Sequence, residues 1–540
     1  MAEEAALYDV PDRSHLVQYV QDERRRYLMF YGEGWLYESL PKGSRVIYGP
    51  EPLPGVPDVR AAVEQAIENP IETEPLSAQL RPGMKVTIVF DDLSLTLPPM
   101  RRPDFRQVAI ELLLEKLDRA GVEDVHLIAA LGIHRRMTPR ELRGILGRRI
   151  FDRFYPQGRL YNHDAEDPDN LVLLGKTEAG EHVELNRRAV ESDLVIYVNL
   201  CLTAMDGGHK SLNTGITSYR SLYHHHNPQT LLHARSLMDP RRSALHASLE
   251  RMGRLVNEKL NVFHIESTYN TATFPSAFSF LTKREEDWSA LDKLLFRINK
   301  AATETLPRPV IRRVFHSIKA PYGVTSVQAG KTDPVHAITL KNIYRQQLVP
   351  VEGQADVLIA GTPYLGPYNV YSILNPLLVH CLMLGYMFNM YLGKPLVREG
   401  GVLILAHPMS YEFHEEHHPS YIRFFEEVLP QTRDPEEIFQ KYERAYAEDP
   451  EFRRRFREGY AFHGAHAMYM WYWGTHALHH LGKVIVLKPE NDRAREACRR
   501  MGYDTADSLP EALEKAQEVV GADPQITLYH WPPIFLCQVS

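Results

Sequence analysis

The segments MKVTIVFDD (84–92) and VHLIAALGIH (125–134) decide the fold of this chain. Each begins as a compact apolar run, which is typical of a strand buried on both faces of a parallel sheet. A helical pattern, FRQVAIELLLEKLDRAG (105–121), lies between them and ends at a glycine. In such a unit the carboxyl ends of both strands lie at one sheet edge, where α/β proteins place their sites. We therefore expect the aspartates that close the first strand to lie beside the histidine that follows the second.

The same alternation continues along the chain. SDLVIYVNL (192–200) predicts a third strand that leads into a Gly-Gly loop. After about residue 350 the pattern restarts, with strands at ADVLIAGT (355–362), GVLILAH (401–407) and KVIVLKP (483–489) and a final helix near 509–520. These features predict an α/β protein with two α/β domains, mainly parallel sheets and an active-site cleft between the domains.

The chain length supports this division, because 540 residues exceed what one hydrophobic core usually holds. We expect an N-terminal extension over 1–80, a catalytic and cofactor-binding α/β domain over 81–335, and a C-terminal α/β domain over 336–540.

Composition restricts the class of function. Hydrophobic residues make up 44% and charged residues 24%, and the net charge is −7 with both signs interspersed. Nucleic-acid binding would need a concentrated basic face, so we expect none. Four cysteines without CxxC spacing indicate neither a disulfide framework nor a thiolate metal site. The acidic N-terminus lacks signal-peptide order, which favours the cytoplasm.

The apolar stretch VYSILNPLLVHCLMLGYMFNMYL (370–392) is long enough to suggest a membrane span. It contains Asn, Pro and His, and it lies deep inside a globular pattern. A buried helix or a subunit interface is therefore the favoured interpretation, and we expect no membrane partner.

Three polar segments are candidates for chemistry. His134 at a strand end could act as a general base, or it could cap the next helix. Lys210, after Gly207 and Gly208, could form a covalent adduct or pair with an anion, or it could be a solvated loop lysine. The run His224–His226 could offer imidazole nitrogens to a metal, although at most two of the three can face one way.

Two other histidine clusters compete with these segments. HEEHH (414–418) matches the zinc-protease signature, but a proline follows it and no apolar helical stripe carries it. A polar loop or helix end is favoured there. The segment 462–480 combines five histidines with aromatic residues, which indicates either packing or a metal or substrate site.

The order of these motifs resembles the nickel-pincer lactate racemase family. GIHRRMT (132–138) resembles the family's GTHRPMT, GGHKS (207–211) matches its GGxK[SA], and His226 falls at the offset of its nickel-ligating histidine. The stretches 162–199, 327–337 and 355–372 resemble further family blocks, so the likeness covers roughly residues 80–490.

The resemblance implies a mechanism and a cofactor. The family uses a nickel-pincer nucleotide, a sulfur-modified pyridinium mononucleotide that holds nickel and accepts a hydride from the substrate carbinol carbon. Carried over, Lys210 holds this cofactor covalently, with Gly207, Gly208 and Asp92 beside it. His226 ligates nickel and His134 is the catalytic base. The enzymes that build the cofactor would then be partners of this chain.

Three departures from the family pattern limit the reaction. The family's second catalytic histidine falls on Leu200, which cannot move protons. Its substrate-carboxylate arginine falls on Leu95 or Leu97, and its substrate lysine falls near Gly366. Without these cations a small carboxylate loses its charge-assisted hydrogen bonds, so lactate itself is not the expected substrate.

Several replacements stay open at this point. Arg101 or Arg102 could bind a carboxylate from another direction, or the substrate is neutral, larger, or both. Tyrosines at 364, 368 and 371 would suit a bulkier molecule. Asp206 or His209 could replace the missing histidine as an acid.

We therefore expect a racemase or epimerase of a 2-hydroxy acid or related hydroxyl-bearing substrate. The alternatives are a one-face oxidoreductase with the same cofactor, a zinc-type metallohydrolase, and a relative that has lost its chemistry. A homo-oligomer remains open.

Overall fold

The two strands that decide the fold lie in a six-stranded sheet. In the computed structural model, which describes residues 8–540, this sheet has the order β12-β11-β10-β5-β6-β7. All neighbours are parallel except β11 and β12. Its strands are β5 (Lys85–Asp91), β6 (Asp124–Ala130), β7 (Leu160–Asn162), β10 (Leu194–Cys201), β11 (Val262–Tyr269) and β12 (Val324–Gly330). The expected strand–helix–strand unit is confirmed, with α4 (Phe105–Arg119) as its helix.

A second, nine-stranded sheet carries the later α/β pattern. Its main path is β1-β4-β19-β14-β16-β17-β18, with β2 beside β14 and β3 beside β2. The later strands are β14 (Ala355–Pro363), β16 (Val397–Ala406), β17 (Lys483–Leu487), β18 (Asp504–Ala506) and β19 (Ile526–Tyr529). The early strands are β1 (Val17–Tyr19), β2 (Arg26–Gly32), β3 (Gly34–Ser39) and β4 (Arg45–Ile47). Part of the segment that we expected to be an N-terminal extension therefore pairs with C-terminal strands.

Two small sheets complete the strands. One joins β13 (Leu348–Val351), β20 (Leu536–Val539) and β15 (Tyr391–Gly393), and the other joins β8 (Leu171–Lys176) and β9 (His182–Asn186). The small sheet of β13, β20 and β15 brings the end of the chain back beside residues near its middle.

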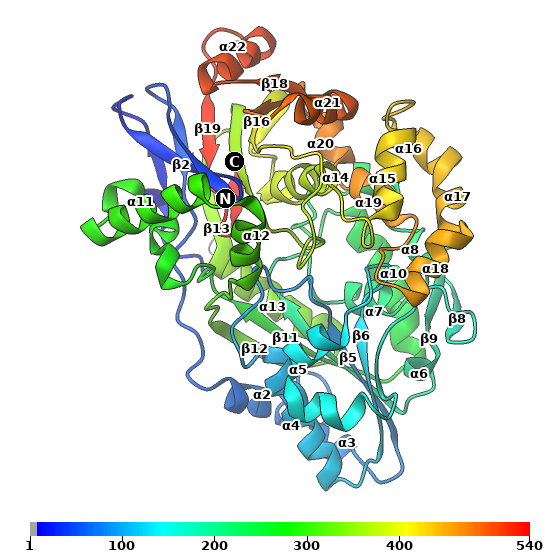
Figure 1. Ribbon diagram of the computed structural model, residues 1–540. Coiled ribbons are helices and arrows are strands. Elements are labelled where there is room, and N and C mark those ends of the chain that lie inside the picture. Colours follow the sequence, from blue (N-terminus) through cyan, green and yellow to red (C-terminus); the bar gives the residue numbers. More distant parts are fainter. Residues whose placement is uncertain (1–7) are drawn as a thin grey trace.

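Helices surround both large sheets (Figure 1). Those of the first half are α2 (Val59–Glu68), α3 (Leu76–Gln79), α4, α5 (Pro139–Phe154), α6 (Arg187–Val190), α7 (Lys210–Gly215), α8 (Tyr219–Leu222), α9 (Pro228–Leu232), α10 (Ala244–Lys259), α11 (Ala290–Thr305), α12 (Arg308–Ser317) and α13 (Thr332–Gln347). Those of the second half are α14 (Pro376–His380), α15 (Pro419–Arg423), α16 (Pro435–Ile438), α17 (Arg444–Ala447), α18 (Pro450–Glu458), α19 (His466–Tyr472), α20 (Thr475–His480), α21 (Asp492–Met501) and α22 (Leu509–Val520). The α/β class with mainly parallel sheets is confirmed.

The apolar stretch near 370–392 lies inside the protein. It forms α14, a π-helical turn η4 (Cys381–Tyr386) and a 3₁₀ turn η5 (Met387–Asn389), and every residue of these elements is buried. Across residues 8–540 no helix combines the length and apolar character that crossing a bilayer requires. The expected burial is confirmed, and the stretch is not one continuous α-helix, because the backbone changes its helical type twice.

Candidate active site

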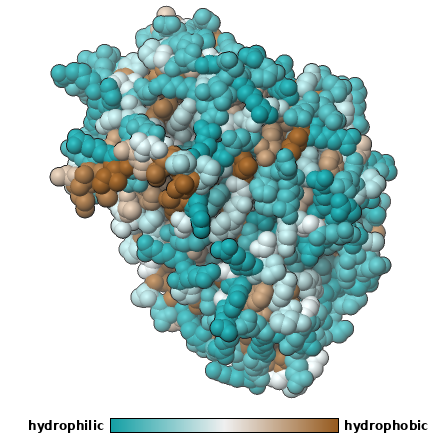
Figure 2. Space-filling model, viewed as in Figure 1, coloured by the Kyte–Doolittle hydropathy of each residue, from teal (hydrophilic) through white to brown (hydrophobic). Residues whose placement is uncertain are grey.

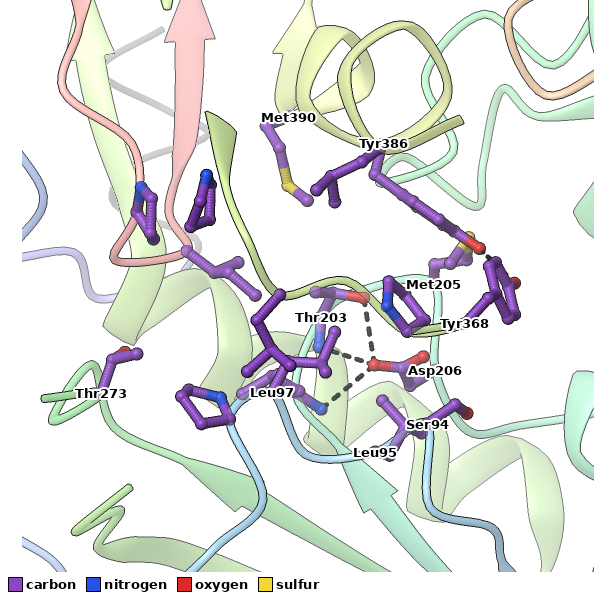
Figure 3. Close-up of a pocket in the computed structure, with 18 of the residues that line it drawn as sticks. Ser94, Leu95, Leu97, Thr203, Met205, Asp206, Thr273, Tyr368, Tyr386 and Met390 are labelled. Carbon is purple, nitrogen blue, oxygen red and sulfur yellow. Dashed lines mark hydrogen bonds between the residues drawn. The ribbon is translucent and has the colours of Figure 1, made fainter. Parts of the chain in front are cut away.

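A cavity of about 180 Å³ lies between the two halves of the chain. Residues from both large sheets or the loops that follow their strands form its walls (Figure 3). The walls are mostly apolar, and their aliphatic residues include Leu95, Leu97, Leu202, Met205, Leu365, Leu382 and Met390. Three of the residues singled out from the sequence also line it, namely His134, Lys210 and His226.

His134 is supported by a buried carboxylate. Its Nδ1 lies 2.9 Å from Oδ2 of Asp92, which is 5% exposed. Burial alone would raise the pKa of Asp92, but contacts with His134 and Ser94 outweigh burial and hold this pKa below its ordinary value. The ionised carboxylate favours the tautomer in which Nδ1 carries the proton, so Nε2 is free to accept one.

The remaining residues of GIHRRMT have structural roles. Gly132 has φ +53°, and a Cβ there would lie 2.4 Å from the carbonyl oxygen of Thr214. Thr138, not His134, caps α5, through a capping box with Glu141. Arg135 pairs with the same glutamate at 2.7 Å. The helix-cap alternative for His134 is therefore wrong, which leaves its side chain available to the cavity.

Two glycines bring the loop before Lys210 close to the Glu266–His336 pair. Gly207 has φ +85° and Gly208 has φ +58°, and a Cβ on either would come within 2.7 Å of Glu266 or His336 respectively. The amide of Gly208 donates to Glu266 Oε1 at 2.6 Å, and His336 Nδ1 lies 3.1 Å from Oε2. Neither glycine lines the cavity, and both hold the loop that presents Lys210.

Lys210 begins α7 and is one of the residues that line the cavity. Its Nζ lies 3.6 Å from Oδ1 of Asp206, and its side chain is 20% exposed. The other oxygen of Asp206 accepts from the amides of Leu202 and Thr203, at 3.2 and 2.8 Å, and from the Thr203 hydroxyl at 3.0 Å (Figure 3). The lysine is thus a partly buried amine with one carboxylate neighbour, not a freely solvated loop residue.

Of the three consecutive histidines, only His226 lines the cavity. Its Nδ1 lies 2.8 Å from Nδ1 of His225, and its ring packs against Tyr469 and Trp473. Burial, with His225 and Lys210 nearby, holds the pKa of His226 well below its ordinary value. The side chain is therefore a neutral imidazole, the form that ligates metals.

The residues at the positions that depart from the family pattern lie in different places relative to the cavity. Leu200 is fully buried in the core and donates its amide to Asp91 Oδ2 at 2.6 Å, so its side chain does not reach the cavity. Leu95 and Leu97 do line the cavity. Arg101 and Arg102 are exposed and are not part of its wall.

Of the two candidates for a second acid, only one lies in the cavity wall. Asp206 lines the cavity, whereas His209 pairs with Asp333 at 2.8 Å outside it. Of the three tyrosines expected near the substrate, only Tyr368 contributes to the wall; Tyr364 and Tyr371 lie elsewhere.

Tyr368 was expected from the sequence, but its hydrogen-bonding partner Tyr386 was not. The hydroxyls of Tyr368 and Tyr386 are 2.6 Å apart, and both residues line the cavity (Figure 3). The ring of Tyr368 lies 5.0 Å from that of His134 in an edge-on arrangement. Burial raises the pKa of both phenols well above its usual range, so they stay protonated and donate hydrogen bonds. Tyr386 lies inside the apolar stretch, whose pattern gave no signal of a site.

The competing histidine clusters are not built as metal sites. HEEHH lies in a turn before α15, so its histidines are not on one helix face. His466 bonds Tyr421 at 2.6 Å, and His463 lies 3.0 Å from Glu166. In the described part of the chain no three His, Cys, Asp or Glu side chains gather as a protein metal site would need.

Comparison with known proteins places the sequence in context. Residues 31–239 match the lactate racemase N-terminal domain. A lactate racemase from Thermoanaerobacterium thermosaccharolyticum is 25% identical over 169 residues, which is 30% of this chain and 37% of that protein. A lactate racemase from Lactiplantibacillus plantarum is 23% identical over 230 residues, which is 42% of this chain and 48% of that protein. The alignments thus span less than half of either curated relative.

Solved structures extend the likeness to the fold. The lactate racemase apoprotein from T. thermosaccharolyticum superposes with a TM-score of 0.62 and 17% identity, covering 95% of this chain and all of that one. A Thermotoga maritima protein superposes with a TM-score of 0.52 and 13% identity, covering 89% and 97%. The chain therefore shares its two-sheet α/β fold with a lactate racemase apoprotein. Residues 31–239 resemble the lactate racemase N-terminal domain, and the chain is similar to lactate racemases over part of its length.

Proposed function

We propose that this chain is a racemase or epimerase that inverts a hydroxyl-bearing carbon by proton-coupled hydride transfer with a nickel-pincer nucleotide. The observation that carries the proposal is the convergence of His134, Lys210 and His226 on one cavity. These residues come from three separate segments, so their meeting depends on the whole fold. The chemistry of each matches the part that the family resemblance implies for it.

The residues present fit the cofactor at its two attachment points. Lys210 would hold it covalently, because its amine reaches the cavity on a short, closely held loop. His226 would ligate nickel, because burial keeps its imidazole neutral while Nδ1 is occupied by His225. When bound, the cofactor supplies an acceptor for a hydride.

The remaining steps belong to protein side chains. Nε2 of His134 takes the hydroxyl proton while Asp92 stabilises the imidazolium through Nδ1. If the carbinol hydrogen also left as a hydride to the bound cofactor, the substrate would become a carbonyl compound. Return of the hydride to the opposite face of the carbonyl carbon, with return of the proton from His134 to the oxygen, would invert the centre. Asp206 is the carboxylate in the cavity that could serve the second face.

The walls support a neutral substrate bulkier than lactate. Apart from Lys210, no lysine or arginine lines the cavity within the described residues, and that amine already has Asp206 beside it. A carboxylate placed against Leu95 and Leu97 would lose its hydration without gaining a partner. We therefore expect an apolar secondary alcohol.

A one-face oxidoreductase is the second candidate. The observation that favours it is the burial of Leu200 in the core, which leaves one histidine base in the cavity. Incubating a single enantiomer of a substrate separates the two functions. A racemase gives both enantiomers, whereas an oxidoreductase gives a carbonyl product and leaves the remaining alcohol unchanged in configuration.

The cofactor is tested by intact-protein mass spectrometry with metal analysis. The chain is produced together with the nickel-pincer biosynthesis enzymes, as wild type, as Lys210→Ala and as Lys341→Ala, a change of an exposed lysine on α13. We expect a covalent adduct and nickel in the wild type and in Lys341→Ala, and neither in Lys210→Ala. Unmodified wild type from a host that loads an authentic lactate racemase would overturn the cofactor proposal.

A further inference from the structure

Helix α11 presents an apolar stripe to solvent. Leu291, Leu294 and Ile298 are 62%, 53% and 56% exposed, and their spacing of three and four residues places them on one helix face. The opposite side of the same helix buries Phe296 against the protein. Figure 2 shows the resulting hydrophobic surface on the flank where Figure 1 places α11.

The stripe continues onto the next helix. Leu306, Val310 and Val314 are each 45% exposed, along the connection and the outer face of α12. We name these six residues of α11, α12 and their connection the α11–α12 patch. Together they expose on the order of 500 Å² of apolar surface, which is at the upper end for a monomer and marks patches that bind something.

Basic residues without partners lie around the patch. Lys293, Arg297 and Arg313 are exposed, and none has an ion pair within residues 8–540. The neighbouring acidic groups Glu304 and Asp292 are each engaged by a lysine. Although the whole chain carries −7, the unpaired charge beside the patch is therefore positive.

We propose that the α11–α12 patch docks on an anionic lipid surface. An apolar face bordered by Lys and Arg is the pattern of helices that lie in a membrane interface. A second copy fits less well, because a two-fold contact would bring the same basic residues of both copies to one seam. This proposal departs from our sequence-based expectation that no membrane takes part.

The patch is continuous with the wall of the cavity. Phe315 on α12 and Ile318 just after it line the cavity, while Val310 and Val314 of the same helix are exposed. If the patch lies on a bilayer, an apolar alcohol dissolved in that bilayer would be separated from the cavity only by helix α12. This link rests on the proposed function, whereas docking itself does not.

Vesicle flotation of the full chain tests the docking. The probes are vesicles of phosphatidylcholine with phosphatidylglycerol, and vesicles of phosphatidylcholine alone. The variants are the double change Leu294→Ser with Ile298→Ser, and Lys293→Glu with Arg297→Glu. Leu173→Ser is the matched control, because Leu173 is also 53% exposed but lies on β8, outside the patch.

We expect wild type and Leu173→Ser to float with the anionic vesicles. The serine double variant should lose at least tenfold in partitioning. The glutamate double variant should lose a similar factor, since each basic residue near an anionic surface contributes about fivefold, and 0.5 M salt should reduce wild-type binding. Absence of wild-type binding, or binding that the serine variant retains, would overturn the proposal. So would a wild-type dimer in sedimentation velocity that the serine variant dissociates.

Discussion

At the scale of single residues, the Asp92–His134 contact determines which nitrogen of the imidazole can accept a proton. Replacing Asp92 with Asn keeps the shape but removes the charge that stabilises the imidazolium. We expect Asp92→Asn to lower kcat by about 100-fold or more, in the range of lost acid–base catalysis. The Lys210 adduct should persist, which mass spectrometry would check alongside steady-state kinetics. Wild-type turnover in this variant would remove Asp92 from the mechanism.

Single side chains in the cavity wall are also expected to determine whether a substrate carboxylate can bind. Leu95 and Leu97 line the cavity, and the family resemblance places a carboxylate-binding arginine at one of these two positions. Leu97→Arg should raise the affinity for a small 2-hydroxy carboxylate such as lactate at least tenfold, because a charge-assisted hydrogen bond becomes available. Titration calorimetry would measure this, with Leu97→Met as a volume-matched control. Equal affinities for lactate in both variants would indicate that another part of the wall excludes the carboxylate.

The residues that meet at the cavity could be predicted where a local motif marks them. His134 follows a strand end, Lys210 follows two glycines, and His226 ends a run of three histidines. Tyr386 could not be found in this way, because it lies in an apolar run and reaches the cavity through a π-helical turn. His209 was weighed as an acid because of its neighbours in sequence, but its partner Asp333 is 124 residues away.

At the scale of elements, the loop that presents Lys210 depends on two glycines. A Cβ at Gly208 would lie 2.7 Å from the His336 ring, at a φ of +58° that side chains rarely adopt. We expect Gly208→Ala to reduce the free energy of unfolding by about 1–3 kcal/mol and to reduce the Lys210 adduct. Denaturant unfolding and intact mass would measure these effects. Gly180→Ala is the control, because its φ is also positive but nothing lies near its Cβ. A fully loaded Gly208→Ala would show that the loop tolerates the shift.

Strands proved easier to predict than helices because a buried parallel strand is a continuous apolar run. The boundaries of β5, β6 and β16 fall within a few residues of their runs. The stretch 370–392 is apolar throughout, so its sequence pattern does not change where the backbone changes to the π-helical and 3₁₀ turns. The outward apolar stripe of α11 has helical spacing too, and only the structure shows that it faces solvent.

At the scale of the whole molecule, pairing between distant segments lies beyond sequence patterns. Strand β4 near the start of the chain pairs with β19 near its end. The fold class was predictable from the alternation of strand and helix patterns in the sequence. The pairing of β4 with β19 was not, because no local feature of residues 45–47 indicates which strand they pair with. The cavity depends on the same closure, since its walls come from segments between Phe30 and Ile534.

A buried carboxyl group joins the two halves and makes their stability depend on pH. Glu443 is fully buried and accepts from the Tyr219 hydroxyl at 2.9 Å, across 224 residues of sequence. Burial raises its pKa to about 8, and the hydrogen bond from Tyr219 offsets only part of this. The folded state therefore keeps a proton that the unfolded chain loses near pH 4.5. Stability is not reduced below that pH, falls as pH rises towards 8, and stays lower above it.

Replacing Glu443 with Gln should remove this dependence, because the amide keeps the hydrogen bond without a charge to bury. Between pH 5 and pH 8.5 we expect the wild type to lose a few kcal/mol more than Glu443→Gln, following the linkage between pKa and stability. Thermal unfolding at both pH values would measure this as a smaller fall in Tm for the variant. Glu416→Gln, at an exposed position, is the matched control and should behave as the wild type. Equal falls in Tm for wild type and Glu443→Gln would mean that water reaches the carboxylate, and that this contact is not the pH-sensitive link between the halves.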